Sequence, residues 1–533
     1  MTLRHRFRSV RGAFVKAGAV GAAVVVLGGL VVAPATAQPT APKAPDVNLI
    51  PGACPALFAF GVQGTGESSP DAAPTTDTGM LSTVFAPMLA KSNTPGLVDR
   101  AYVPYESGFG GAVPGGQVPY SQSVEGGLAK LRSMVQGVAA NCEKTQFAVA
   151  AYSQGAHVGS MFAQEVGQGR GVIPAERLAA VALFGDPTRN PSAPLFPGAP
   201  GKQTPDPAPG TEGAAVSAIK ALAQLPATGG GIAPERDVAP NFGAVTGRVA
   251  TFCVAGDLAC DAPTGAPILR AVTNVVGQSK LSGGDPVASL ASIAQALAFT
   301  TIKTATKVVN EDISGNSLAN LSINPRKSIS ERLAEASDPR APVNIPDALK
   351  ALLKVGMIGL NVVTTVVRTV LTPANIADLA TVGLANPPAA LLALGTKLLG
   401  ALPQLIPPTT VSRLVQQSFT AVVDNITDNA ELLNTATWVK YWDTVQRHGA
   451  YGSATVAANG EAPVQFVADW FAALARDVAA AFGAGGDPLR KPVAGSATPV
   501  PGRAPAGDYP FGPGAGSASS TAPKPQGDFP FGP

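Results

Sequence analysis

The chain has 533 residues and a formal net charge of +3, with 46% hydrophobic and only 14% charged residues. This composition suits a large buried core, and the length leaves room for an accessory region beside it. The low charge and the lack of an extensive basic patch in the sequence argue against a nucleic-acid partner.

The N-terminus has the three parts of a secretory signal. A basic start precedes an apolar run at 17–32 and a small-x-small site that ends at Ala37. We therefore expect a signal peptide at 1–37 and a secreted protein, against the alternative of an uncleaved anchor. Its removal takes away five basic residues and no acidic one, which lowers the formal net charge to −2. A Pro/Ala-rich linker follows at 38–50, and beyond it no apolar stretch reaches the roughly 20 residues of a transmembrane helix.

The region 51–262 predicts the first part of an α/β domain. Short apolar runs alternate with amphipathic stretches, which is the pattern of parallel strands joined by crossover helices. We expect a doubly wound, mainly parallel five-stranded sheet with its reactive groups in loops at the carboxyl ends of the strands. The Pro/Gly-rich segment 190–245 is expected to be a long surface loop. Strands are expected at 56–62, 98–103, 145–151, 178–184 and 248–254, and helices at about 78–91, 121–139 and 154–166.

Residues 263–440 differ from the preceding region in sequence pattern and predict an all-helical insertion. Apolar residues recur at helical spacing, and prolines interrupt them. With so few charges, these helices must pack on the α/β domain, on each other or on lipid, and packing within the protein is the simpler interpretation. The expected helices lie at about 287–309, 346–371, 376–401 and 411–436.

The α/β domain is expected to close at 441–485, with its last helix near 463–482. The tail at 486–533 is rich in Pro and Gly and is expected to be disordered. It contains one short repeat, at 507–513 and 527–533, whose aromatic–Pro pairs could contact the cell envelope.

A nucleophile elbow is predicted at residues 151–155, between an apolar strand and a helix. In such an elbow a sharp turn exposes the central hydroxyl, here that of Ser153, and small residues on either side let the strand and the helix approach closely. The first of these small residues is Ala151 where Gly is usual, which makes the match slightly weaker.

A serine hydroxyl needs a base to take its proton, and histidine is the usual base near neutral pH. The mature chain offers only His157 and His448. His157 follows the elbow by four residues on the same helix and cannot easily return to Ser153, so a packed or hydrogen-bonded role is expected for it. His448, which precedes a glycine, is by elimination the predicted base.

A carboxylate at a strand end must hold the imidazole in the right tautomer. Asp257 and Asp186 both follow expected strands, and both satisfy the order Ser, Asp, His. Asp257 lies between two cysteines that could fix its loop, so it is favoured, and Asp186 is expected to cap a loop. The backbone N–H of Gln154 and the loop around Thr65 are the predicted oxyanion hole.

Four cysteines, Cys54, Cys142, Cys253 and Cys260, form an even set, which in an exported chain favours two disulfides. Three connectivities are possible. Cys253 and Cys260 close a short loop, so pairing them, and Cys54 with Cys142, is the simplest choice. Zinc is a poor alternative because the chain has no CxxC pair and few histidines, and we expect no metal or other cofactor.

The chain resembles the cutinases, and specifically the cutinase-like esterases of actinobacteria, a family of α/β-hydrolases. The resemblance covers about 50–262 and 441–485 and rests on the elbow at 152–156, the cysteine-bounded loop at 253–260, and a histidine followed closely by a tyrosine at 448–451. It implies Ser153 as nucleophile, Asp257 and His448 as its partners, Thr65 and Gln154 as the oxyanion hole, and a Cys54–Cys142 bridge.

Two departures from the family pattern concern Ala151 and Gln63, which stand where Gly and often Arg are usual. A larger departure is the insertion, which separates Asp257 from His448. We expect it to form a lid or an acyl-chain groove over the site. The predicted function is that of a secreted serine esterase acting on ester bonds of lipids or polyesters, extracellular or associated with the cell envelope. The alternatives are an acyltransferase acting on envelope lipids and a non-catalytic envelope-binding protein.

Overall fold

The computed structural model of the chain describes Leu49, residues 53–358, parts of 416–452 and residues 461–482. Gaps within the first long range lie at 93, 95, 112–115, 223–226, 280–295, 297–298 and 316–320. The predicted signal peptide, the tail, the helix at 376–401 and all of the linker except Leu49 lie outside the described residues. Within the part of the chain that is described, no helix has the length and apolarity to cross a membrane.

A five-stranded, fully parallel sheet forms the centre of what we term the main domain, residues 53–262 and 443–482. The strand order is β2-β1-β3-β4-β5. Every residue of β1, β4 and β5 is buried, which explains why these strands appear in the sequence as continuous apolar runs. The predicted sheet is thereby confirmed. The strands are β1 (Leu57–Val62), β2 (Val98–Tyr102), β3 (Gln146–Tyr152), β4 (Leu178–Phe184) and β5 (Val249–Phe252).

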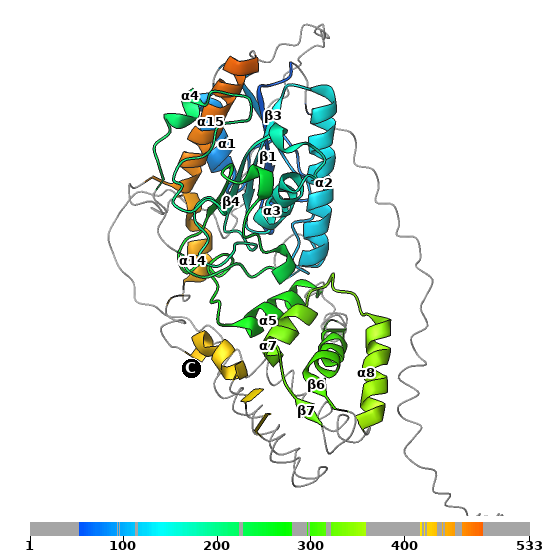
Figure 1. Cartoon of the computed structure of the whole chain (residues 1–533). Coiled ribbons are helices and arrows are strands. Elements are labelled where there is room, and N and C mark those ends of the chain that lie inside the picture. The colour runs from blue at the N-terminus through cyan, green and yellow to red at the C-terminus, as the bar shows by residue number, and fades with distance from the viewer. Residues whose placement is uncertain are drawn as a thin grey trace, which may run out of the picture. The chain divides into compact units, whose positions relative to one another are not determined.

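Helices cover both faces of this sheet. Helices α1 (Ser82–Lys91) and α15 (Pro463–Phe482) pack together on one side, and α2 (Tyr120–Asn141) and α3 (Gln154–Gly167) on the other (Figure 1). Helix α15 carries the fully buried Trp470 into the core. The last helix of the chain's described part therefore completes a layer that begins with the first helix.

The segment 190–245 differs from the predicted surface loop. It contains α4 (Ala214–Ser217) and two short 3-10 helices, Glu235–Asp237 and Gly243–Val245. Phe196 and Leu222 from this segment are fully buried in the core. Proline and glycine correctly indicate many turns here, but turns do not exclude burial of the apolar side chains between them.

The described part of the insertion, residues 263–440, is mostly helical. It contains α5 (Pro267–Gly277), α7 (Ile329–Ala336) and α8 (Ile345–Ile358). The prediction of an all-helical insertion is wrong at one point, because β6 (Ile313–Ser314) and β7 (Ser322–Ile323) form a short antiparallel ribbon. The expected helix at 346–371 is described only to residue 358, and the expected helices at 287–309 and 411–436 are described only in pieces.

Helix α7 was not predicted, although its start has a local signal. Ser328 accepts a hydrogen bond from the backbone N–H of Glu331, and the Glu331 side chain accepts one from the backbone N–H of Ser328. This reciprocal pair is a capping box, which marks a helix N-terminus in sequence. Helix α7 packs against α5, so the first helix of the insertion is tied to a segment some sixty residues later.

Candidate active site

Ser153 lies at the turn between β3 and α3, where the elbow was predicted. Its backbone has φ 55° and ψ −121°, in the region that residues other than glycine rarely adopt. A Cβ on Gly155 would lie 2.0 Å from the carbonyl oxygen of Val62, so only glycine fits there. The turn therefore combines a strained serine with a close approach of α3 to β1.

Ala151 does not disturb this elbow. A Cβ on Gly159 would lie only 2.8 Å from the Cβ of Ala151, so the absence of a side chain at Gly159, one turn beyond Gly155, leaves room for the methyl group. A glycine on the helix thus compensates for the alanine on the strand.

The structure brings Ser153, His448 and Asp257 together. His448 ends α14 (Thr444–His448), and its Nε2 lies 2.7 Å from Ser153 Oγ. Its Nδ1 lies 2.9 Å from both carboxylate oxygens of Asp257. Because a carboxylate only accepts hydrogen bonds, Nδ1 carries the proton and Nε2 is left to accept from the serine hydroxyl. This is the arrangement in which a histidine activates a serine.

Two tyrosines hold the histidine and its carboxylate. Tyr152 stacks on the His448 ring, with ring centroids 5.2 Å apart, and donates its hydroxyl to the His448 carbonyl at 2.9 Å. Tyr451 is fully buried and donates to Asp257 Oδ2 at 2.6 Å. The sequence reasoning assigned Tyr451 no role, although its spacing from His448 was a signal that could have found it.

The charges around His448 favour its protonated form. Burial alone would lower the pKa of His448, but the charge and hydrogen bond of Asp257, with a smaller contribution from Glu67, raise this pKa above its usual value. For the Glu67 carboxyl, burial has the opposite effect and raises the pKa. The Glu67 carboxylate accepts hydrogen bonds from the backbone N–H groups of Gly64 and Met80, so it also holds the loop that contains Thr65.

Asp186, the alternative carboxylate, has different partners. Its Oδ1 accepts hydrogen bonds from the backbone N–H and the hydroxyl of Thr188, both at 2.8 Å. Burial raises the pKa of Asp186 to about 6. The role expected for it, capping a loop, agrees with these contacts.

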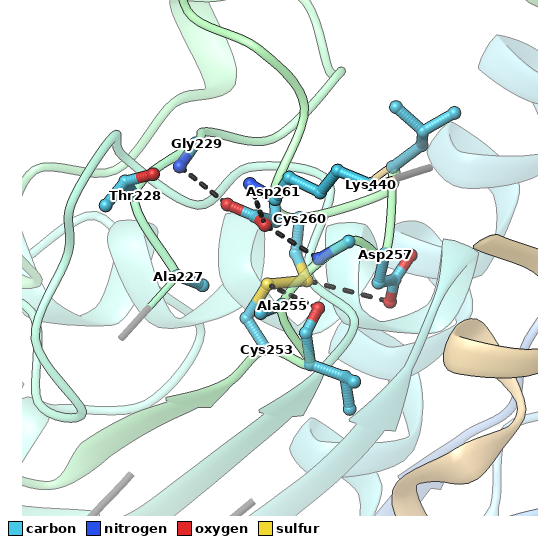
Figure 2. Close-up of polar contacts among 12 residues, drawn as sticks. Ala227, Thr228, Gly229, Cys253, Ala255, Asp257, Cys260, Asp261 and Lys440 are labelled. Atoms are coloured by element: carbon cyan, nitrogen blue, oxygen red, sulfur yellow. Dashed lines mark hydrogen bonds and ion pairs between the residues drawn. A yellow bond between two sulfur atoms is a disulfide. The ribbon is translucent and has the colours of Figure 1, made fainter. Parts of the chain in front are cut away.

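The loop that carries Asp257 is fixed at both ends (Figure 2). A disulfide joins Cys253 to Cys260, and the other bridge joins Cys54 to Cys142, the simplest pairing expected. The neighbouring Asp261 is fully buried, and it accepts hydrogen bonds from the backbone N–H groups of Gly229 and Gly256. Lys440, at the end of the insertion, forms an ion pair with Asp261 at 2.7 Å.

A buried arginine adds to this support. Arg189 is 2% exposed, and its guanidinium donates to the carbonyl oxygens of Gly229, Cys260, Ala193 and Ala227. A charged group that binds several carbonyls in this way fixes the backbone of three separate segments. Arg189 gave no signal in the sequence, because its partners are all backbone atoms brought together by the fold.

The predicted oxyanion residues, Thr65 and Gln154, line the same pocket as Ser153 and His448. The Gln154 side chain is already engaged, because it accepts from the Ser123 hydroxyl and donates to the Gly108 carbonyl. What Gln154 can offer a developing oxyanion is therefore its backbone N–H, at the first turn of α3.

His157 is a buried partner in a separate network. Its Nδ1 lies 3.1 Å from the Tyr120 hydroxyl, and its Nε2 lies 3.1 Å from Asp237 Oδ2. The expected packed and hydrogen-bonded role fits these contacts. Asp237 also binds Arg340 of the insertion, and together these contacts keep the pKa of Asp237 below its usual value although burial opposes them.

The pocket in front of Ser153 has a volume of about 240 Å³ and a mainly apolar lining. Such a lining with a few polar groups at one end suits a ligand with an apolar chain. Among the described residues, no group of three or more His, Cys, Asp or Glu side chains could hold a metal ion.

Sequence comparison places these residues in a family. Residues 72–270 match the family model described as Cutinase. Over 231 residues the chain is 29% identical to a protein of Corynebacterium glutamicum described as a carboxylesterase Culp6 homolog, an alignment that covers 42% of this chain and 72% of that protein. Residues 72–270, most of the first part of the main domain, thus carry the match to the cutinase family. The matched region contains Ser153 and Asp257, whereas His448 lies beyond it, after the insertion.

Solved structures with similarity to this chain include three proteins. A cutinase-like protein from Cryptococcus sp. is 17% identical, with a TM-score of 0.25, over 39% of this chain and 81% of that protein. The catalytic core of acetyl xylan esterase from Trichoderma reesei is 19% identical, with a TM-score of 0.26, over 45% and 98%. Lysin B from Mycobacteriophage D29 is 19% identical, with a TM-score of 0.26, over 53% and 86%.

Proposed function

We propose that this carboxylic ester hydrolase acts on lipid or polyester esters through an acyl-enzyme formed on Ser153. The observation that carries the proposal is the continuous chain of hydrogen bonds from Ser153 Oγ to His448 Nε2 and from His448 Nδ1 to Asp257. A serine on a strained elbow that is bonded to a carboxylate-oriented histidine is the arrangement required of a serine nucleophile.

In the first half of the reaction, Ser153 Oγ forms a bond to the ester carbonyl carbon while its proton moves to His448 Nε2. The negative charge that develops on the carbonyl oxygen is stabilised by the backbone N–H of Gln154 and by Thr65. The intermediate collapses with cleavage of the bond to the alcohol oxygen, which takes the proton from His448. Asp257 stabilises the imidazolium while it exists.

In the second half, water attacks the acyl group on Ser153 and gives its proton to His448. The second tetrahedral intermediate releases the carboxylic acid, and Ser153 Oγ recovers the proton from His448. The mainly apolar pocket supports an acyl chain as the part of the substrate bound beside Ser153.

The test uses a fluorophosphonate probe, which reacts with activated serines, together with hydrolysis of p-nitrophenyl esters. The unmodified mature protein is expected to label and turn over, while Ser153→Ala and His448→Ala do neither. Ser133→Ala, on the exposed face of α2, is the matched serine control and should behave as the unmodified protein. Labelling that persists in Ser153→Ala would refute the assignment.

We also propose that the protein is exported. The support is the pair of disulfides, because such bridges form and persist in oxidising compartments. Contact of the tail at 486–533 with the cell envelope stays a prediction.

A further inference from the structure

The pocket in front of Ser153 has walls from two parts of the chain. The main domain contributes apolar residues such as Phe109, Val124 and Ile232. The insertion contributes a second wall with residues from two of its segments, the end of α5 and the turn after α7. The insertion residues on this wall are Thr273, Asn274, Gly277, Pro339 and Arg340.

Ion pairs fasten the turn after α7 to the main domain. Arg340 pairs with the buried Asp237, and Arg236, the preceding neighbour in the main domain, pairs with Asp338. Each of the two segments thus carries one acidic and one basic side chain, and each of these pairs with the opposite charge on the other segment. Arg340 also lies 3.6 Å from Asp338 of its own segment. Because Asp237 and Asp338 are both largely buried, these pairs are less screened by solvent than ordinary surface pairs.

The two insertion segments are also tied to each other. Asn274 Nδ2 donates to the Ser337 hydroxyl at 3.0 Å, and both residues are buried. Lys303 Nζ donates to the backbone carbonyl of Asp338 at 2.9 Å. The wall is therefore held from both sides, by the insertion behind it and by the main domain beside it.

Resting on the proposed esterase function, we propose that Gly277 and Arg340 are specificity-determining residues that set the length of the acyl chain. Both residues line the pocket, Gly277 without a side chain and Arg340 with a long one. At about 240 Å³ the pocket lies just below the roughly 300–1,000 Å³ of sites that take drug-sized ligands. The substrate class is thus an ester whose acyl chain is of modest length and ends against the insertion.

Gly277 offers a clean way to shorten the pocket. A Cβ placed there would lie 3.6 Å from Tyr120 Cβ, an ordinary van der Waals contact, and the backbone is not in the left-handed region. A Cβ at this position therefore meets Tyr120 at ordinary contact distance, and larger side chains extend from there into the lining. Arg340→Ala should have the opposite effect, because it removes a long side chain from the lining and leaves Asp237 with His157 as partner.

The experiment measures kcat/KM of the full mature protein for p-nitrophenyl esters from two to sixteen carbons. Gly277→Val should lower kcat/KM for the longest chains accepted by about tenfold or more relative to the acetate ester. Arg340→Ala should move the optimum towards longer chains. Gly137→Val, on the exposed face of α2 where nothing lies within 4 Å of the added Cβ, is the matched control and should leave the profile unchanged.

Fluorophosphonate labelling of each variant separates the two proposals. If the variants label as the unmodified protein does and neither shifts the chain-length profile, the specificity assignment is overturned and the esterase function stands. If the unmodified protein does not label, the esterase function fails first. Opposite shifts in Gly277→Val and Arg340→Ala, with labelling retained, support the assignment.

Discussion

The carboxyl ends of β4 and β5 are similar in sequence and structure yet differ in use. A glycine in the left-handed region follows β4 directly, Gly185 with φ 59°, and another comes four residues after β5 ends, Gly256 with φ 88°. Each glycine precedes an aspartate that is 1% exposed, Asp186 or Asp257. The strands are parallel neighbours, so both carboxylates lie at the same edge of the sheet. Only Asp257 is hydrogen-bonded to His448.

The difference lies in the groups that face each carboxylate. Asp257 accepts hydrogen bonds from His448, from the Tyr451 hydroxyl and from the Ala259 backbone N–H, which together stabilise its charge. Asp186 is bonded to Thr188, and its pKa is raised to about 6 by burial. Burial alone therefore does not bring a carboxylate to His448, and the return of the chain through His448 and Tyr451 decides which of the two loops the histidine contacts.

The largest expected effect separates these two residues directly. Asp257→Asn should lower kcat by about 10⁴-fold, because an amide no longer holds His448 in the tautomer that accepts the serine proton. Asp186→Asn should keep kcat within about threefold of the unmodified protein. Steady-state hydrolysis of a p-nitrophenyl ester measures both. A large loss in Asp186→Asn, with activity retained in Asp257→Asn, would reverse the assignment.

A smaller effect is expected when Asp257 loses one donor. Tyr451→Phe should lower kcat by about tenfold, the scale of one hydrogen bond to a charged group. Without this donor the Asp257 charge acts more strongly on His448, so the pKa of His448 should rise. Activity requires neutral His448, and the acid limb of the kcat/KM profile should therefore move to higher pH.

The matched control for this variant is Tyr102→Phe. Tyr102 is also buried and donates to a carboxylate, that of Asp77, but it lies on β2, which β1 separates from the strand that leads into Ser153. Tyr102→Phe should change the stability of the protein without moving the pH profile of kcat/KM. An acid limb that stays in place in Tyr451→Phe would show that this tyrosine supports only the fold.

The smallest effect concerns the stability cost of burying Asp186. Its pKa in the folded protein, about 6, is above the usual value near 3.9, so between these pH values the folded state binds more protons than the unfolded state. The stability of the unmodified protein should therefore fall as pH rises through this window. Asp186→Asn removes this dependence and should gain about 1 kcal/mol at pH 8, since the new amide offsets part of the gain.

Denaturant unfolding at pH 4.5 and pH 8 measures this difference. The free energy of unfolding of Asp186→Asn, relative to that of the unmodified protein, should be higher at pH 8 than at pH 4.5. An equal difference at both pH values would mean that Asp186 is not buried as a perturbed acid.

The features of the sheet were predictable because they depend on local pattern. Buried parallel strands require apolar runs, and each of the five strands begins or ends within one residue of its predicted bounds. The elbow has a similar local cause, since Gly155 has no room for a side chain against Val62. The position of Ser153 at a strand–helix turn could therefore be predicted.

Features that depend on segments distant in sequence could not be predicted in this way. Phe196 and Leu222 are buried within a segment whose composition indicated only turns. The pairing of Arg236 and Asp237 with Asp338 and Arg340 requires two segments about a hundred residues apart to meet. The sequence predicts a lid or groove formed by the insertion, but no periodicity indicates which insertion residues would line the pocket.

The central claim, that Ser153 carries the acyl group, is tested most directly by locating that group. The mature protein is mixed with a p-nitrophenyl ester, quenched in acid during the first turnover, digested and mapped by mass spectrometry. We expect a burst of p-nitrophenol and one acyl adduct, on the peptide that contains Ser153, with neither in Ser153→Ala. An adduct on another residue, or a burst that survives in Ser153→Ala, would contradict that claim.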